Sequence, residues 1–307
     1  YSGLPLRAGD DVLTSTHDHF ATHESLRLAT SRAGATLRKV PMYERPEAAS
    51  APAMAAAIAK AIVPATRFVA ITWVHSGTGV KTPVRAIADA VAAVNAKRPP
   101  EQRILLCVDG VHGFGVDATP VGQLGCDFFA AGTHKWMFGP RGTGVLWGKH
   151  ELWPTLHPSI PDFGYASYIA WTGGKEAPPR TADTFSPGGF HSFEHRWALG
   201  EAFEMHREIG PAKIAARIAE LNRQCKQGLA AMKHVTLHTP LADDISAGIT
   251  TFEVAGMKPD AVVKRLHDKK IVASTTPYVT TYARLAPGLI NTPADVDAAL
   301  REIRALA

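Results

Sequence analysis

Short apolar segments alternate with helical segments along the first half of this chain, and this alternation restricts the fold more than any other feature of the sequence. The expected strands span residues 12–15, 35–40, 68–74, 103–109, 126–131 and 143–148. The expected helices span residues 24–32, 51–62 and 83–97. Strands that alternate with helices are typical of an α/β fold, in which a mainly parallel sheet is flanked by helices.

The second half begins with a stretch of different composition, over residues 153–189. It is rich in Pro, Gly and aromatic residues and lacks periodicity, so we interpret it as a lid, a subunit contact or a substrate wall. Helices are then expected over 193–208, 211–232, 259–268 and from 292 onward, and strands over 235–238, 249–254, 271–274 and 282–285. Thr292 is the expected N-cap of the last helix, with Asp295 three positions later.

We therefore expect two domains, a large cofactor-binding domain over residues 1–205 and a smaller α+β C-terminal domain over residues 206–307. The composition, with 46% hydrophobic and 20% charged residues among 307, is typical of a globular protein of this size. The chain opens with a turn that is expected to lie already inside a domain, so we expect a further N-terminal portion upstream.

The charged residues predict a small-molecule partner and no nucleic-acid partner. The net charge is +5, but the basic residues are spread along the chain without runs, which indicates only weak attraction for anionic small molecules. No apolar run approaches the roughly 20 residues that span a bilayer, so no membrane span is expected. The three cysteines form no CxxC spacing, which argues against a disulfide framework or a structural zinc site and leaves a single bridge open.

Lys135 stands out because an apolar run, residues 128–131, precedes it and a glycine-rich segment, residues 139–144, follows it. Most lysines are solvated surface charges. A lysine held at a strand end by glycine-permitted turns can instead lose its proton through desolvation and become a nucleophilic amine. The neighbouring motifs decide between these two interpretations.

Polar clusters follow three of the expected strands, after Val74, at residues 109–112 and at residues 133–135. In an open α/β sheet the ligand lies beyond the carboxyl ends of the strands, so these clusters are expected to meet at one edge. Asp109 alone fits a loop-capping carboxylate. Together, Lys135 and Asp109 fit a pyridoxal phosphate site, which needs a lysine for the Schiff base and an acid beside the ring nitrogen.

Two motifs with this spacing identify a resemblance to a known family. The segment 108–112, VDGVH, and the segment 133–142, THKWMFGPRG, resemble the cofactor motifs of the class V aminotransferase family. The similarity runs from about Gly3 to the C-terminus. The segment 186–197, SPGGFHSFEHRW, resembles the isopenicillin N epimerase-like branch, and through it the resemblance implies a homodimer.

The resemblance implies roles for several residues near the cofactor. Lys135 is the Schiff-base lysine and Asp109 the partner of the pyridinium nitrogen. His112 is expected to contact the ring hydroxyl oxygen, and His134 a phosphate oxygen. His19 is the expected ring-stacking residue, although its neighbours His17 and His23 leave the register open.

Other positions are weaker matches to the family. Ser76 stands where relatives commonly have asparagine, and Thr133 is the substitute for a phosphate-binding serine that relatives have at position 132. Arg284 matches the arginine that binds the substrate carboxylate in a bidentate manner. Desulfurases of the family place a nucleophilic cysteine shortly before that arginine, and here the last cysteine is Cys225, far upstream.

The expected function is that of a pyridoxal-phosphate-dependent enzyme which acts on an amino acid or an amino-acid-derived substrate, through a Lys135 aldimine and removal of the Cα proton. Transamination, epimerisation and β-elimination stay open, as does the compartment, because most members are cytoplasmic and some epimerase-like members are exported. The first alternative is a degenerate relative that binds the cofactor or a partner without turnover. The second is a metal-dependent hydrolase, suggested by 14 histidines and by two groupings, His17-Asp18-His19 and Asp109 with His112.

Overall fold

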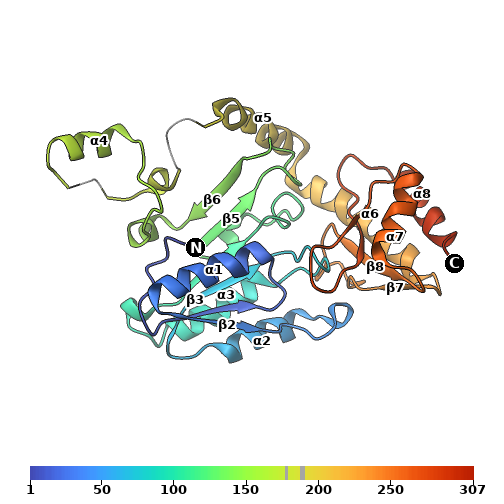
Figure 1. Ribbon diagram of the computed structural model, residues 1–307, viewed down its shortest axis with the longest axis horizontal. Coiled ribbons are helices and arrows are strands. Elements are labelled where there is room, and N and C mark those ends of the chain that lie inside the picture. The colour runs from blue at the N-terminus through green and yellow to red at the C-terminus, as the bar shows by residue number, and fades with distance from the viewer. Residues whose placement is uncertain (177–178, 187–190) are drawn as a thin grey trace.

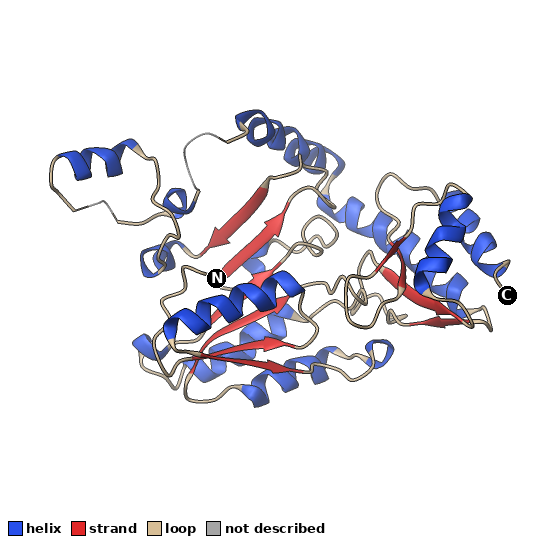
Figure 2. Ribbon diagram, viewed as in Figure 1, coloured by secondary structure: helices blue, strands red, loops and turns tan. Residues whose placement is uncertain are grey.

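Parallel strands form the larger of two sheets in the computed structural model, which describes residues 1–176, 179–186 and 191–307. The strands, drawn in red in Figure 2, are β1 (Asp11–Ser15), β2 (Thr36–Val40), β3 (Thr66–Thr72), β4 (Leu105–Asp109), β5 (Phe128–Gly132) and β6 (Gly144–Gly148). They pair in the order β2-β1-β3-β4-β5-β6. All pairs are parallel except β5 with β6. The predicted mainly parallel α/β sheet is confirmed.

Helices cover both faces of this sheet (Figure 1). They are α1 (Phe20–Ala33), α2 (Ala51–Ala61) and α3 (Val84–Asn95). Leu26 of α1 packs with alternate strand residues such as Cys107, whereas Ile58 and Ile87 of the other two helices pack with Leu106 on the opposite face. Short 3-10 helices span Pro46–Ala48, Pro100–Gln102, Val121–Gln123, His150–Thr155 and Ala182–Phe185.

A smaller antiparallel sheet forms the core of the C-terminal region. It contains β7 (Val235–Leu237), β8 (Thr250–Val254), β9 (Ser274–Thr275) and β10 (Ala283–Leu285), in the order β7-β8-β10-β9. The helices there are α5 (Phe193–Ile209), α6 (Pro211–Ala230), α7 (Pro259–Asp268) and α8 (Pro293–Arg304). The predicted cap is present, because the Thr292 hydroxyl accepts from the Asp295 amide while the Asp295 carboxylate accepts from the Thr292 amide.

The bounds of several elements differ from the sequence-based expectation; α1, for example, begins at Phe20 rather than at residue 24. The strand expected from residue 271 begins only at Ser274, because Lys270 adopts a left-handed φ of 64° and the Ile271 amide still bonds to Leu266 at the end of α7. The connection expected without periodicity contains the helix α4 (Tyr165–Thr172), at the end of the molecule opposite α8 (Figure 1). Of the epimerase-like segment 186–197, residues 187–190 lie outside the described residues.

Contacts between loops join the regions of the two sheets. Val80 and Ser246 form an isolated bridge, and the Thr239 hydroxyl donates to the carbonyl of Thr78 at 2.7 Å. Gly79 has a φ of +73°, and a Cβ there would lie 2.3 Å from the carbonyl oxygen of Ile249, so this approach requires glycine. The boundary expected between residues 205 and 206 falls inside α5, and the division into two domains stays a prediction.

Lys226 on α6 stabilises the small-sheet side of this junction. Its side chain is fully buried, and its ammonium donates to the carbonyl of Leu241 at 2.8 Å, to the Asp243 carboxylate at 3.0 Å and to the Ser246 hydroxyl at 2.7 Å. These contacts fix the loop over residues 241–246 on α6, and Ser246 of this loop forms the bridge to Val80. None of the helices in the described residues is long and apolar enough to cross a membrane.

Replacing Lys226 by Met keeps the length of the side chain and leaves the acceptors of the loop unsatisfied. We expect Lys226→Met to lower the free energy of unfolding by about 1–3 kcal/mol. Urea unfolding followed by circular dichroism measures it. The same change at the exposed Lys233 is the control and should stay within about 0.5 kcal/mol of the wild type. Equal stability of the two variants would contradict the assignment.

Candidate active site

Five of the predicted site residues line one cavity of about 390 Å³ at the carboxyl edge of the large sheet. The cavity is lined by His19, Ser76, His112, Lys135, Trp136, Pro277 and Arg284. The first five follow the ends of β1, β3, β4 and β5, whereas Pro277 and Arg284 come from the small-sheet region. Both sheets therefore contribute walls to this cavity.

The Lys135 amine lies 2.7 Å from Nε2 of His112. On the other side of the imidazole, the indole N–H of Trp136 donates to Nδ1 at 3.4 Å. Burial lowers the pKa of Lys135, while the Asp109 carboxylate raises it and the Arg284 guanidinium lowers it. Burial, followed by the nearby positive charge of Lys135, lowers the pKa of His112 to about 3.

Asp109 ends β4 and lines an adjoining cavity of about 730 Å³, together with His134 and the turn at Gly142–Gly144. Its carboxylate accepts from the Thr22 hydroxyl and from the Val111 amide, both at 3.0 Å. Burial raises the pKa of Asp109, against the lowering effect of these two hydrogen bonds. A carboxylate held in this way is best stabilised by a cationic partner.

The structure distinguishes the three neighbouring histidines. His19 lines the Lys135 cavity, caps α1 through its Nδ1, which accepts from the Ala21 amide, and faces the ring of Tyr278 edge-on at 6.0 Å. His17 instead stacks on Tyr43 with ring centroids 3.7 Å apart, and His23 bonds to the carbonyl of Ser15. Of the three, His19 has the placement expected for a ring-stacking residue.

Thr133 is not brought together with the other predicted residues. Its side chain is fully buried, and its hydroxyl lies 2.5 Å from that of Thr143. His134, the next residue, is exposed and lines the Asp109 cavity. The phosphate contact predicted for His134 therefore has a suitable location, whereas the Thr133 hydroxyl is occupied by another contact.

Ser76 joins the two sides of the cavity. Its hydroxyl lies 2.8 Å from the Tyr278 hydroxyl, and its carbonyl accepts from Nη1 of Arg284 at 3.1 Å. Nε of Arg284 donates to the Ser274 hydroxyl at 3.0 Å, so the plane of the guanidinium is fixed by two contacts. Burial lowers the pKa of Arg284 and raises that of Tyr278 to about 12.

Sequence reasoning missed five residues of this site, namely Thr22, Trp136, Ser274, Pro277 and Tyr278. Trp136 had a local signal, because it follows Lys135 directly. Thr22 and Tyr278 had none, since their partners Asp109 and Ser76 lie 87 and 202 positions away along the chain.

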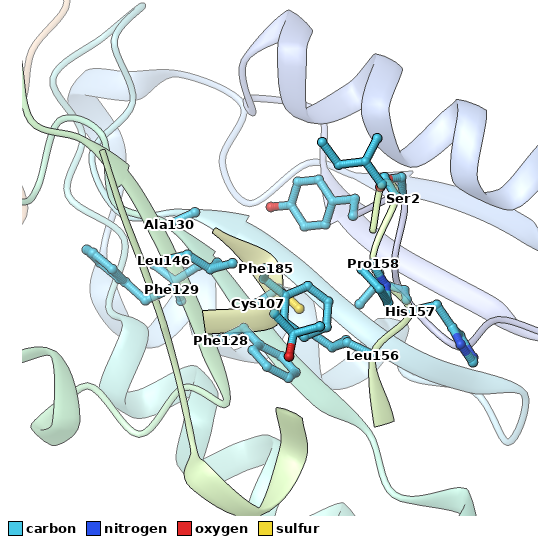
Figure 3. A pocket seen from close by; sticks show the side chains of 17 residues that line it. Ser2, Cys107, Phe128, Phe129, Ala130, Leu146, Leu156, His157, Pro158 and Phe185 are labelled. Carbon is cyan, nitrogen blue, oxygen red and sulfur yellow. The ribbon is translucent and has the colours of Figure 1, made fainter. Parts of the chain in front are cut away.

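A further cavity, of about 460 Å³, lies on the α1 face of the sheet and holds none of the predicted site residues (Figure 3). Apolar side chains such as Phe128, Leu146, Leu156 and Phe185 line it, together with the thiol of Cys107. The polar groups suited to chemistry are instead gathered at the strand ends.

A model of the class V aminotransferase family matches residues 1–298. The chain belongs to this family. The family is pyridoxal-phosphate dependent, so the predicted cofactor class is confirmed.

The isopenicillin N epimerase of Streptomyces clavuligerus is 28% identical over 263 residues, which are 82% of this chain and 62% of that protein. A probable cysteine desulfurase of Vibrio cholerae is 25% identical over 75% of this chain and 52% of its own length. The chain thus spans between half and two thirds of these two relatives.

Solved structures share the fold. The apo cysteine desulfurase of Thermococcus onnurineus NA1 has a TM-score of 0.83 at 20% identity, over 99% of this chain and 75% of that one. The cystine C–S lyase C-DES, in complex with its product cysteine persulfide, has a TM-score of 0.84 at 20% identity, over 98% of this chain and 77% of that one. The mainly parallel sheet and the smaller antiparallel sheet agree with this fold.

The groups around Lys135 fit pyridoxal phosphate. The set contains a partly buried amine, a buried carboxylate at the end of the adjacent strand, and imidazoles on two sides. Thr72, which is opposite Asp109 in the β3–β4 register, has a buried hydroxyl without a hydrogen-bond partner among the described residues. Among the described residues of the whole chain, no group of three or more His, Cys, Asp or Glu side chains is arranged to hold a metal ion.

The lowered pKa of His112 predicts a pH effect on stability. The folded protein favours the neutral imidazole of His112, whereas the unfolded chain takes up a proton at the ordinary pKa of 6.5. The contribution of His112 to stability is therefore complete above pH 6.5 and is lost as the pH falls toward about 3. We expect His112→Gln to become progressively more stable relative to the wild type between pH 7 and pH 4. Urea unfolding across this range measures the difference. Exposed His150→Gln is the control, and parallel curves for His112→Gln and the wild type would contradict the assignment.

Proposed function

We propose that this protein is a pyridoxal-phosphate-dependent enzyme that acts at the α carbon of an amino acid or an amino-acid-derived substrate. The main support is the placement of the Lys135 amine, 2.7 Å from His112 in a cavity that also contains Arg284. The amine and the guanidinium are the two groups that such a reaction requires, one for the cofactor and the α proton and one for the substrate carboxylate.

Each residue has a task that its surroundings favour. Lys135 would hold the cofactor covalently and later move the proton of the α carbon, because burial favours its neutral form. Asp109 would bind the ring nitrogen and His112 the ring hydroxyl oxygen. When bound, the cofactor stabilises the negative charge left at the α carbon.

Arg284 would bind the substrate carboxylate. Ser274 and the carbonyl of Ser76 fix its orientation, and the cavity removes part of its hydration, which strengthens a charge-assisted hydrogen bond. Ser76 and Tyr278 form the wall next to it, and these residues would contact the substrate side chain.

The cysteines argue against a reaction that uses a protein thiol. Cys107, Cys126 and Cys225 are free and buried, and burial raises their pKa values to about 12, 11 and 12. Cys225 packs in the buried core of the small-sheet region with Ala283 and Leu285, and it does not line the cavity that contains Arg284. Of the reactions suggested by the relatives, transamination, epimerisation and elimination without a nucleophilic cysteine fit this chain better than a desulfurase reaction.

We also propose a homodimer. Large aromatic side chains on α4 and α5 are exposed, with Tyr165, Trp171 and Trp197 each between 74% and 78% accessible. Such side chains favour contact with another protein surface. Light scattering of the purified protein measures its mass and tests this state.

Lys135→Ala tests the cofactor role. The wild type should give a yellow adduct with pyridoxal phosphate that borohydride fixes on Lys135, as seen by peptide mass spectrometry. The variant should give no fixed adduct, because no other described amine lines this cavity. Lys97→Ala, at an exposed position, is the control. A fixed adduct of equal yield in Lys135→Ala would overturn the proposal, and unchanged biological activity of this variant would favour a degenerate relative that binds the cofactor or a partner without turnover.

Arg284→Lys tests the substrate role. Lys keeps the charge and loses the bidentate geometry, so kcat/KM should fall about 10- to 100-fold, mainly through KM. Loss of deuterium from the α carbon across a panel of amino acids identifies the substrates and measures the rate. Arg265→Lys, on the exposed side of α7, should retain the wild-type value. An equal effect of both changes would remove Arg284 from the site.

A further inference from the structure

Three neighbouring side chains form a directed chain of hydrogen bonds in the Lys135 cavity. The indole Nε1 of Trp136 lies 3.4 Å from Nδ1 of His112, and Nε2 of the same imidazole lies 2.7 Å from the Lys135 amine. An indole nitrogen is a donor only, so the Nδ1 atom that it contacts must be the acceptor. The direction of the first hydrogen bond therefore determines the protonation of the imidazole.

We propose that Trp136 is a positioning residue, whose indole N–H holds His112 in the tautomer that carries its proton on Nε2, so that His112 donates to a neutral Lys135 amine. The proposal deepens the proposed function and rests on it, because the neutral amine matters only if Lys135 binds the cofactor. Trp136 acts through His112 and needs no contact with the cofactor itself.

The opposite arrangement leaves two donors facing each other. If Lys135 were an ammonium that donates to Nε2 of His112, a neutral imidazole would carry its proton on Nδ1. That N–H would then point at the indole N–H, and both groups would lose their hydrogen bond inside a partly buried cavity. A doubly protonated His112 would have the same conflict and would also face the Lys135 charge.

The charges that face these groups favour the same state. Burial lowers the pKa of Lys135, with Arg284 acting in the same direction and Asp109 against it. Burial also lowers the pKa of His112, and the facing groups Lys135, Arg284, His19 and His134 lower it further. The described groups around His112 therefore favour a neutral imidazole, which has one proton to place on either nitrogen.

The indole is held firmly enough to direct its N–H. Trp136 is only 9% exposed and packs in an apolar cluster with Ile214 and Ile218 of α6. Its carbonyl accepts from Nε2 of His206 on α5 at 3.1 Å. A Cβ at Gly248 would lie 2.8 Å from the indole ring, so there is little room for the ring to turn. The small-sheet region thus orients the indole.

The proposed state has two chemical uses. A neutral amine has the lone pair that Lys135 would need in order to hold an aldehyde cofactor covalently. The Nε2 proton of His112 would then be free for donation to the ring hydroxyl oxygen, the partner that the family resemblance implies for this residue. One tautomer serves both steps.

The tautomer is measured directly by ¹⁵N NMR of protein labelled at histidine, with His112 assigned by its loss in His112→Gln. We expect a proton on Nε2 in the cofactor-free wild type and a mixture of tautomers in Trp136→Phe, which keeps an aromatic ring and removes the N–H. Trp147→Phe on β6 is the matched control and should resemble the wild type. A wild-type proton on Nδ1 would overturn the proposal without any variant.

A second readout follows the amine. Acetic anhydride acetylates only neutral amines, and mass spectrometry of the peptide that contains Lys135 gives the pH profile of its reaction. We expect the midpoint in Trp136→Phe to move to higher pH, with about two- to fivefold less acetylation at pH 7 than in the wild type or Trp147→Phe. An unchanged midpoint would contradict the role of Trp136. Failure of the cofactor to bind Lys135 would instead contradict the proposed function, and neither NMR nor acetylation depends on that binding.

Discussion

The carboxyl edge of the large sheet depends on the buried carboxylate of Asp18. It accepts hydrogen bonds from the Thr14 hydroxyl and the Ser15 amide at the end of β1, and from the Thr72 amide at the end of β3. Asp18 is only 2% exposed, and a carboxylate in that position is stable only with such partners. The two strand ends that precede His19 and Ser76 are therefore fixed to each other before any ligand is present.

The groups proposed for the reaction lie where water is only partly available. Burial raises the pKa of Asp109 and lowers the pKa values of Lys135 and Arg284. In each case the shift disfavours the charged form. Each group alone would be more stable in water, so their assembly reduces stability locally and is supported by the packing elsewhere. The apolar clusters on both faces of the sheet and in the small-sheet region provide that support.

Local patterns were sufficient to predict the sheet, its flanking helices and the convergence of Asp109, His112 and Lys135, because strand ends in a parallel sheet share an edge. The family motifs added the cofactor. They could not show that Thr22 binds Asp109, since a contact across 87 positions depends on how α1 packs on β4. The late start of β9 at Ser274 was equally hidden, because it follows from the left-handed backbone of Lys270 rather than from hydrophobicity. The residue roles inherited from the family stay predictions.

The loop that carries Tyr278 connects β9 to β10, and these two strands pair with each other on either side of it. Its ends are thus fixed by the small sheet, while Tyr278 reaches across to Ser76 on the large-sheet side. Mutations inside this loop can change the shape of the proposed substrate wall without moving the lysine or the aspartate. Related proteins can therefore differ in substrate preference through substitutions at a few positions of this loop, while the residues around the lysine and the aspartate stay the same.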